Sequence, residues 1–140
     1  MKRAMLIGET RVGKSSLIGV LSNKPFKSHR AMAVEYHEGF INTPGEFLEN
    51  HRFYTALITA SADAEVILMV LDATRSASLF PPSSAAVFNK QVVGIITKID
   101  LPDADIVRAE RLLRNTGTRH IVHTSVVSGA GLDELRCILA

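Results

Sequence analysis

The sequence has little cysteine and little net charge. Cys137 is the only cysteine among 140 residues, so no disulfide can form within the chain, and we expect a reducing, cytoplasmic compartment. The five histidines form no Cys/His cluster with the spacing of a zinc site. The formal net charge is +2 and no run of Lys or Arg exceeds two residues, a pattern that does not favour nucleic-acid binding.

Long apolar runs are missing as well. The longest run, residues 66–71, is far shorter than the ~20 residues of a membrane-spanning helix. The apolar stretch that follows Lys2 and Arg3 meets Gly8 too soon to be the core of a signal peptide. We therefore expect neither membrane insertion nor an export segment.

What is present is the composition of an ordinary globular domain. Hydrophobic residues make up 46% of the chain and charged residues 21%. A chain of this length buries roughly two thirds of the surface that its unfolded form exposes. We expect a single domain over residues 1–140.

Short apolar runs alternate with helical stretches along the chain. The runs 4–7, 66–71, 92–97 and 120–123 predict buried strands of a mainly parallel sheet. The stretches 14–21, 48–59, 83–89, 106–115 and 132–139 predict helices. Such alternation is typical of a three-layer, doubly wound α/β domain with helices on both faces of the sheet. Residues 24–36 predict a mobile loop that leads into edge strands near 33–36 and 39–41.

The segment GETRVGKSS, residues 8–16, matches the phosphate-loop pattern G-x-x-x-x-G-K-[ST] and lies between a predicted strand and a predicted helix. Its glycines let successive backbone amides face phosphate oxygens at the helix N-terminus. Lys14 is expected to reach the β- and γ-phosphates, and the Ser15 hydroxyl to bind Mg²⁺. The expected nucleotide contacts in this loop are Gly8, Arg11, Val12, Gly13, Lys14, Ser15 and Ser16.

Two later segments are placed to read a base. Thr97-Lys98-Ile99-Asp100 follows an apolar strand, and a carboxylate at Asp100 can accept from both the ring N–H and the exocyclic amino group of guanine. Adenine lacks that pair of donors. The stem of Lys98 can cover the base or stiffen the phosphate loop, and backbone N–H groups near Ser125 and Val126 can reach the guanine O6.

The segment FINTPGEF, residues 40–47, has the form of a turn that senses the γ-phosphate, but Asn42 stands where an aspartate would orient Mg²⁺. Asn42 keeps an acceptor oxygen and lacks the charge that Mg²⁺ favours, so the metal site should be weakened. The backbone N–H of Gly45 can still meet the γ-phosphate. Glu46 is a candidate base for the attacking water, although a structural or partner-facing role is favoured.

Taken together, these segments resemble the guanine-nucleotide domain of small bacterial GTPases. More narrowly, the whole chain resembles the EutP/PduV family of ethanolamine- and propanediol-utilisation proteins, through MKRAMLIGETRVGKSSL, through residues 41–74 and 79–101, and through TSVVSGAGLDELRCIL. The resemblance implies a P-loop NTPase fold of the small GTPase-like kind with a shortened switch region. It also implies a role beside microcompartment shell or pathway enzymes.

This chain departs from the family pattern at two positions. Its members have an acidic residue at position 42, and a threonine near position 31, where this chain has Ala31 with Ser28 as the nearest hydroxyl. Three functions stay open: a GTP/GDP-binding protein with Mg²⁺ and weak or partner-dependent GTP hydrolysis, a pseudo-GTPase that acts as an interaction module, and an acetate kinase, an activity attributed to the ethanolamine branch.

Overall fold

The computed structural model describes residues 2–9, 11–22, 33–37 and 39–140, with the side chains of all of these except Glu46 and His51. A six-stranded sheet with the order β2-β3-β1-β4-β5-β6 forms its centre. The strands are β1 (Ala4–Ile7), β2 (Glu35–His37), β3 (Phe40–Asn42), β4 (Val66–Asp72), β5 (Gln91–Thr97) and β6 (His120–His123). Only the β2–β3 pair is antiparallel among these neighbours. This confirms the predicted mainly parallel α/β sheet.

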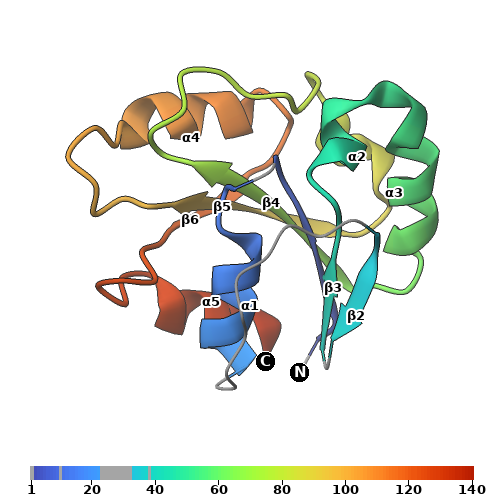
Figure 1. Cartoon of the computed structure of the whole chain (residues 1–140), viewed down its shortest axis with the longest axis horizontal. Coiled ribbons are helices and arrows are strands. Elements are labelled where there is room, and N and C mark those ends of the chain that lie inside the picture. The colour runs from blue at the N-terminus through green and yellow to red at the C-terminus, as the bar shows by residue number, and fades with distance from the viewer. Residues whose placement is uncertain (1, 10, 23–32, 38) are drawn as a thin grey trace.

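Helices cover both faces of the sheet, as Figure 1 shows. On one face lie α1 (Lys14–Ser22) and α5 (Leu132–Leu139), and on the other lie α2 (Glu46–Glu49), α3 (Tyr54–Ser61) and α4 (Ile106–Arg114). Two short 3₁₀ helices, η1 (His51–Phe53) and η2 (Ser84–Val87), complete the second face.

Alternating strand residues feed two hydrophobic cores. In β4, Leu68 packs into the core beneath α1 and α5, whereas Met69 packs into the core beneath α3 and α4. The same alternation separates Leu6 from Ile7 in β1. Every residue of β1 and β4 is buried, and apart from Asp72 at the end of β4 both strands are continuous apolar runs.

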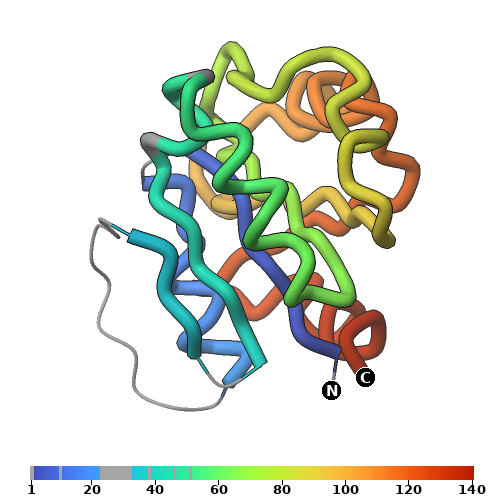
Figure 2. The backbone as a smooth tube through the Cα atoms, turned by 90° about the vertical axis from the view of Figure 1, so that its right-hand side faces the viewer, coloured from blue at the N-terminus to red at the C-terminus, as the bar shows by residue number. Residues whose placement is uncertain are grey.

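The two ends of the described chain lie close together, as Figure 2 shows. The backbone N–H of Lys2 donates to the carbonyl oxygen of Leu139 over 2.7 Å. At α4, the side chain of Asp105 caps the helix by accepting from the N–H of Arg108.

Two predicted helices differ from the structure. The predicted helix 48–59 is divided into α2, η1 and α3, because the Asn50 side chain accepts from the N–H of Arg52 and closes a local turn. The predicted helix 83–89 is only the 3₁₀ helix η2. Ser83 has a left-handed φ of 60°, which no regular helix contains.

At the sheet edge, the predicted strands are present with shifted ends, as β2 and β3. The predicted mobile loop over residues 24–36 lies for the most part outside the described residues.

Candidate nucleotide-binding site

The loop between β1 and α1 requires its glycines. A Cβ atom at Gly8 would lie 2.7 Å from both a Val12 methyl group and the Val70 carbonyl oxygen, so no side chain fits there. Gly13 has a φ of +105°, a conformation that glycine alone adopts readily. Arg11, one of the expected nucleotide contacts, is exposed. The backbone therefore takes the tight course that a phosphate cradle needs.

Helix α1 begins directly after Gly13. Its first residues, Lys14, Ser15 and Ser16, hold backbone N–H groups that have no acceptor within the helix, as at any helix N-terminus. Aligned peptide dipoles place partial positive charge at the same point. Ser15, the second residue of the helix, is buried to 8% exposure. The arrangement suits an anion.

The Lys14 ammonium group closes the loop on itself. It donates to the carbonyl oxygens of Gly8, over 2.6 Å, and Glu9, over 2.9 Å. Burial lowers the pKa of Lys14 from 10.5 to about 8, against the opposing influence of the Glu49 and Glu9 carboxylates. A phosphate placed here would give this buried cation a negatively charged partner.

The end of β5 is tied to the phosphate loop. The Thr97 hydroxyl donates to the carbonyl oxygen of Val12 over 2.6 Å, and the Lys98 ammonium group donates to that of Arg11 over 2.8 Å. Of the two roles predicted for Lys98, this contact supports stiffening of the loop. Lys98 itself has a left-handed φ of 62°, so the chain turns sharply between Thr97 and Asp100.

Asp72, at the end of β4, was not predicted as a site residue. Its carboxylate lies 2.9 Å from the Lys98 ammonium group and accepts from the N–H and hydroxyl of Thr74. Burial alone would raise the pKa of Asp72, but these hydrogen bonds and the Lys98 charge outweigh it and lower that pKa. Asp72 therefore fixes Lys98 over the loop. A carboxylate directly after a buried strand was the available sequence signal.

The two predicted base-reading segments meet through side chains. Asp100 accepts a hydrogen bond from the Ser125 hydroxyl over 2.7 Å, and that hydroxyl accepts from the N–H of Ser128 over 3.1 Å. Of the two backbone N–H groups predicted to reach the guanine O6, that of Ser125 already donates to the carbonyl oxygen of Ala130. The N–H of Val126 donates no backbone hydrogen bond within the described part of the chain.

The turn after β3 is hydrogen-bonded to β1, the strand that leads into the phosphate loop. The Thr43 hydroxyl donates to the carbonyl oxygen of Leu6 over 2.8 Å, and Gly45 is buried just before α2. Asn42 is buried to 1% exposure. Its Oδ1 atom has no hydrogen-bond partner among the described residues. Ser28, Ala31 and the side chain of Glu46 lie outside the described part, so the predictions for them stay predictions.

Glu9 links this loop to the segment after β4, a role that the loop pattern does not specify. One carboxylate oxygen pairs with the guanidinium group of Arg75, and the other accepts from the N–H of Leu79 over 3.1 Å. Glu9 is buried to 6% exposure. The segment that it holds leads directly to Phe80, which forms one wall of an apolar pocket.

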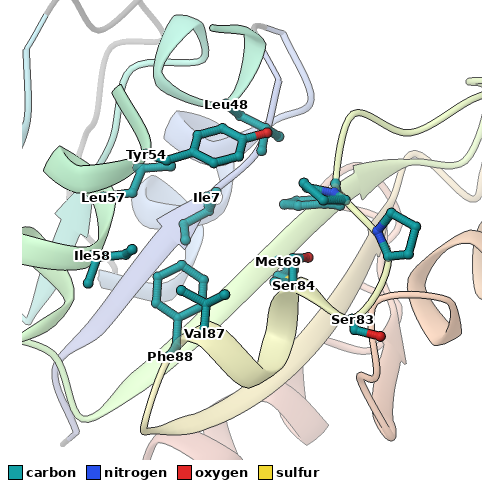
Figure 3. Close-up of a pocket in the computed structure, with 13 residues that line it drawn as sticks. Ile7, Leu48, Tyr54, Leu57, Ile58, Met69, Ser83, Ser84, Val87 and Phe88 are labelled. Carbon is teal, nitrogen blue, oxygen red and sulfur yellow. The ribbon is translucent and has the colours of Figure 1, made fainter. Parts of the chain in front are cut away.

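That pocket, of about 280 Å³, lies between α3 and the segment around η2 (Figure 3). Ile7, Leu57, Met69 and Phe88 supply apolar side chains to it. Its described lining includes Tyr54, Ser83 and Ser84 as polar residues and no Lys, Arg or His. It therefore offers no cation to an anionic acceptor.

The part of the chain that the structure describes offers few candidate ligands for magnesium. No group of three or more His, Cys, Asp or Glu side chains that could hold a metal ion occurs among the described residues. The Ser15 hydroxyl and the unpartnered Oδ1 of Asn42 are oxygen donors of the kind that Mg²⁺ accepts. These residues fit a cation that also binds nucleotide phosphates.

No described helix is long and apolar enough to cross a membrane.

The sheet order, the glycine-shaped loop after β1 and the buried lysine define the architecture of a P-loop NTPase of the small GTPase-like kind. Within that class, the chain belongs to the PduV-EutP family, described as "Ethanolamine utilisation - propanediol utilisation", which it matches over residues 1–140.

The chain is similar to curated members of both branches. It is 35% identical over 136 residues to the propanediol utilization protein PduV of Citrobacter freundii, covering 96% of this chain and 91% of that protein. It is 34% identical over 119 residues to the probable acetate kinase EutP of Escherichia coli (strain K12), covering 84% and 75%. A EutP of Salmonella typhimurium is 34% identical over 121 residues, covering 85% and 76%.

Proposed function

We propose that this chain is a guanine-nucleotide-binding protein of the ethanolamine or propanediol utilisation systems, with weak or partner-dependent GTP hydrolysis. The proposal is supported most by the contact between Asp100 and Ser125, since it fixes a carboxylate at the carboxyl ends of β5 and β6, the edge at which a doubly wound sheet binds its ligand. Thr97 and Lys98 join that edge to the phosphate loop, so base and phosphates would be read by one connected unit.

Guanine matches this unit better than adenine does. Two neighbouring N–H donors of guanine can share the Asp100 carboxylate, whereas adenine would leave it without those bonds. Asp100 is exposed in the nucleotide-free chain, so the cost arises when the bound base covers the carboxylate and leaves it without these bonds. It is then about 1–3 kcal/mol, or roughly 5-fold to 150-fold in affinity.

Titration with fluorescent GDP and ADP tests the base preference. We expect tighter GDP binding, and we expect Asp100→Asn to lose roughly 5-fold to 150-fold in GDP affinity while ADP binding stays nearly unchanged. Asp103→Asn, an exposed substitution in the following turn, is the matched control. Equal or tighter ADP binding by the natural chain would overturn the guanine assignment.

Hydrolysis should be slow because Asn42 contributes no charge at the metal. Turnover at an ordinary GTPase rate with Mg²⁺ and no partner would contradict both the weak GTPase and the pseudo-GTPase alternative. If nucleotide binds and no turnover occurs even with pathway enzymes or shell proteins present, the pseudo-GTPase is favoured.

The cellular association that we propose is with the cytoplasmic enzymes or shell of a utilisation microcompartment.

Acetate kinase activity is the second candidate, because the EutP relatives are named probable acetate kinases. An acceptor carboxylate would need a cation close to the γ-phosphate, and the apolar pocket has none in its described lining. Incubation with acetate and ATP or GTP, followed by detection of acetyl phosphate, separates the two functions. Acetyl phosphate formation that Lys14→Ala abolishes would favour the kinase.

A further inference from the structure

Glu35 lies directly opposite Asn42 in the antiparallel pair of β2 and β3. Residues paired in this way point to the same face of a sheet. Phe40, two positions before Asn42 on the same strand, packs into the core beneath α1 and α5. Asn42 and Glu35 therefore point toward the α1 face, the side on which α1 begins with Lys14 and Ser15.

The contact between the two side chains fixes how the Asn42 amide is oriented. The Nδ2 atom of Asn42 donates to Oε1 of Glu35 over 3.5 Å, the outer limit of a hydrogen bond. A carboxylate accepts only, so it selects the NH₂ group and turns Oδ1 away from itself.

This orientation leaves a buried acceptor unused. Oδ1 of Asn42 has no partner among the described residues, although the side chain is 1% exposed. Buried polar atoms are rarely left in this state, since an unmade hydrogen bond costs about 1–3 kcal/mol. An oxygen held in this way can accept a hydrogen bond from a metal-bound water or coordinate a cation directly.

We propose that Glu35 is a positioning residue for a divalent cation at the phosphate loop: it orients the Asn42 oxygen and supplies, from the neighbouring strand, the negative charge that Asn42 lacks. The proposal rests on the nucleotide site proposed above. Glu35 is 29% exposed on its side chain, and Nε2 of His37 lies 3.4 Å from the same Oε1 atom. The charge is thus partly solvated, which makes it a supporting contribution.

The test measures the dissociation rate of fluorescent GDP over a series of Mg²⁺ concentrations from micromolar to millimolar, and in EDTA. The Mg²⁺ effect is the ratio of the rate in EDTA to the rate with Mg²⁺. We expect Glu35→Gln to weaken the Mg²⁺ effect about tenfold, the low end for loss of a residue that supports a metal ligand. In EDTA the rate should change less than about twofold. Glu35→Asp, which keeps the charge, should restore part of the effect.

Glu35→Gln is then also made in a chain that carries Asn42→Asp, and the two losses of the Mg²⁺ effect are compared. With an aspartate at position 42 the missing charge is restored, so Glu35→Gln should then cost less than about threefold in the Mg²⁺ effect. Glu65→Gln is the matched control. Glu65 directly precedes the first residue of β4, at the end of that strand away from the phosphate loop, so this substitution should leave the Mg²⁺ effect unchanged.

Equal effects of Glu35→Gln in both backgrounds, or an equal loss in EDTA, would overturn the proposal and leave nucleotide binding intact. Failure of the natural chain to bind GDP in any condition would overturn the nucleotide site and this proposal with it. Binding of Mn²⁺ by the GDP-loaded protein, followed by electron paramagnetic resonance, reads the metal directly, and an unchanged Mn²⁺ affinity in Glu35→Gln would also overturn it.

Discussion

Lys14 is a buried lysine, and burial makes its protonated form less favourable in the folded chain. The pKa of about 8 in the folded chain lies below the ordinary value of 10.5, because burial disfavours the ammonium form. Between these two values the unfolded chain binds more protons than the folded chain, so the free energy of unfolding rises with pH. Without a phosphate partner, Lys14 therefore destabilises the fold at neutral pH.

This argument predicts a pH-dependent stability for the nucleotide-free protein. From pH 8 to 9.5 the free energy of unfolding should rise by about 1–2 kcal/mol through Lys14, and Lys14→Met should remove that rise. Urea denaturation at intervals across this range measures the effect, and the window stays below the region in which Tyr54 titrates, since burial raises the pKa of that group. Lys90→Met serves as the exposed control. Parallel curves for the natural chain and Lys14→Met would contradict the prediction.

Some residues of the candidate site could be predicted from the sequence and others could not. Lys14, Thr97 and Asp100 could be named in advance, because a phosphate loop and a strand-end carboxylate have fixed chemical jobs. Glu9 and Asp72 could not, because their partners, Arg75 and Lys98, are distant in sequence and meet only in the fold. The sequence pointed to the backbone N–H of Ser125, whereas in the structure that N–H donates to Ala130 and the Ser125 hydroxyl contacts Asp100.

Between elements, Glu9 connects the phosphate loop to the segment that enters η2. Its contacts with Arg75 and with the N–H of Leu79 are both made by one buried carboxylate. A change at the phosphate loop can therefore reach Phe80 and the apolar pocket through one side chain.

Removing that carboxylate should loosen the segment without unfolding the sheet. In Glu9→Ala we expect the Leu79 amide to exchange hydrogen about tenfold faster, as loss of one hydrogen bond to a charged acceptor implies. Amide exchange followed by nuclear magnetic resonance measures this, with amides in β4 as internal references. Glu110→Ala breaks an exposed pair with Arg114 and is the matched control. Unchanged exchange at Leu79 would show that Glu9 does not hold the segment.

The elements themselves followed from apolar runs where those runs were long, as in β4 and β5. Prediction failed where local side-chain chemistry interrupted a helical pattern, at Asn50 and at Ser83. The pairing of Glu35 with Asn42 could not be predicted, because register in a three-residue edge strand depends on tertiary contacts.

The molecule as a whole has two cores divided by one sheet, and β4 contributes to both. Leu68 faces α1 and α5, whereas Met69 faces α3 and α4. Because the same backbone holds both sets of side chains, loss of one core should remove the support of the other. We therefore expect the two faces to unfold together, which is the physical content of the single-domain prediction for residues 1–140.

Truncation on each face tests this cooperativity. Leu68→Ala and Met69→Ala should each lower the free energy of unfolding by about 2–5 kcal/mol, as core truncations do, whereas Val107→Ala on the exposed side of α4 should change it by less than about 0.5 kcal/mol. Urea unfolding followed by circular dichroism and by tyrosine fluorescence should give one coincident transition for every variant. Excess GDP, at about 100 times its dissociation constant, should raise the stability of all three variants by the same amount, about 2.7 kcal/mol. Two separated transitions, or a GDP effect confined to one of them, would show that the faces fold independently.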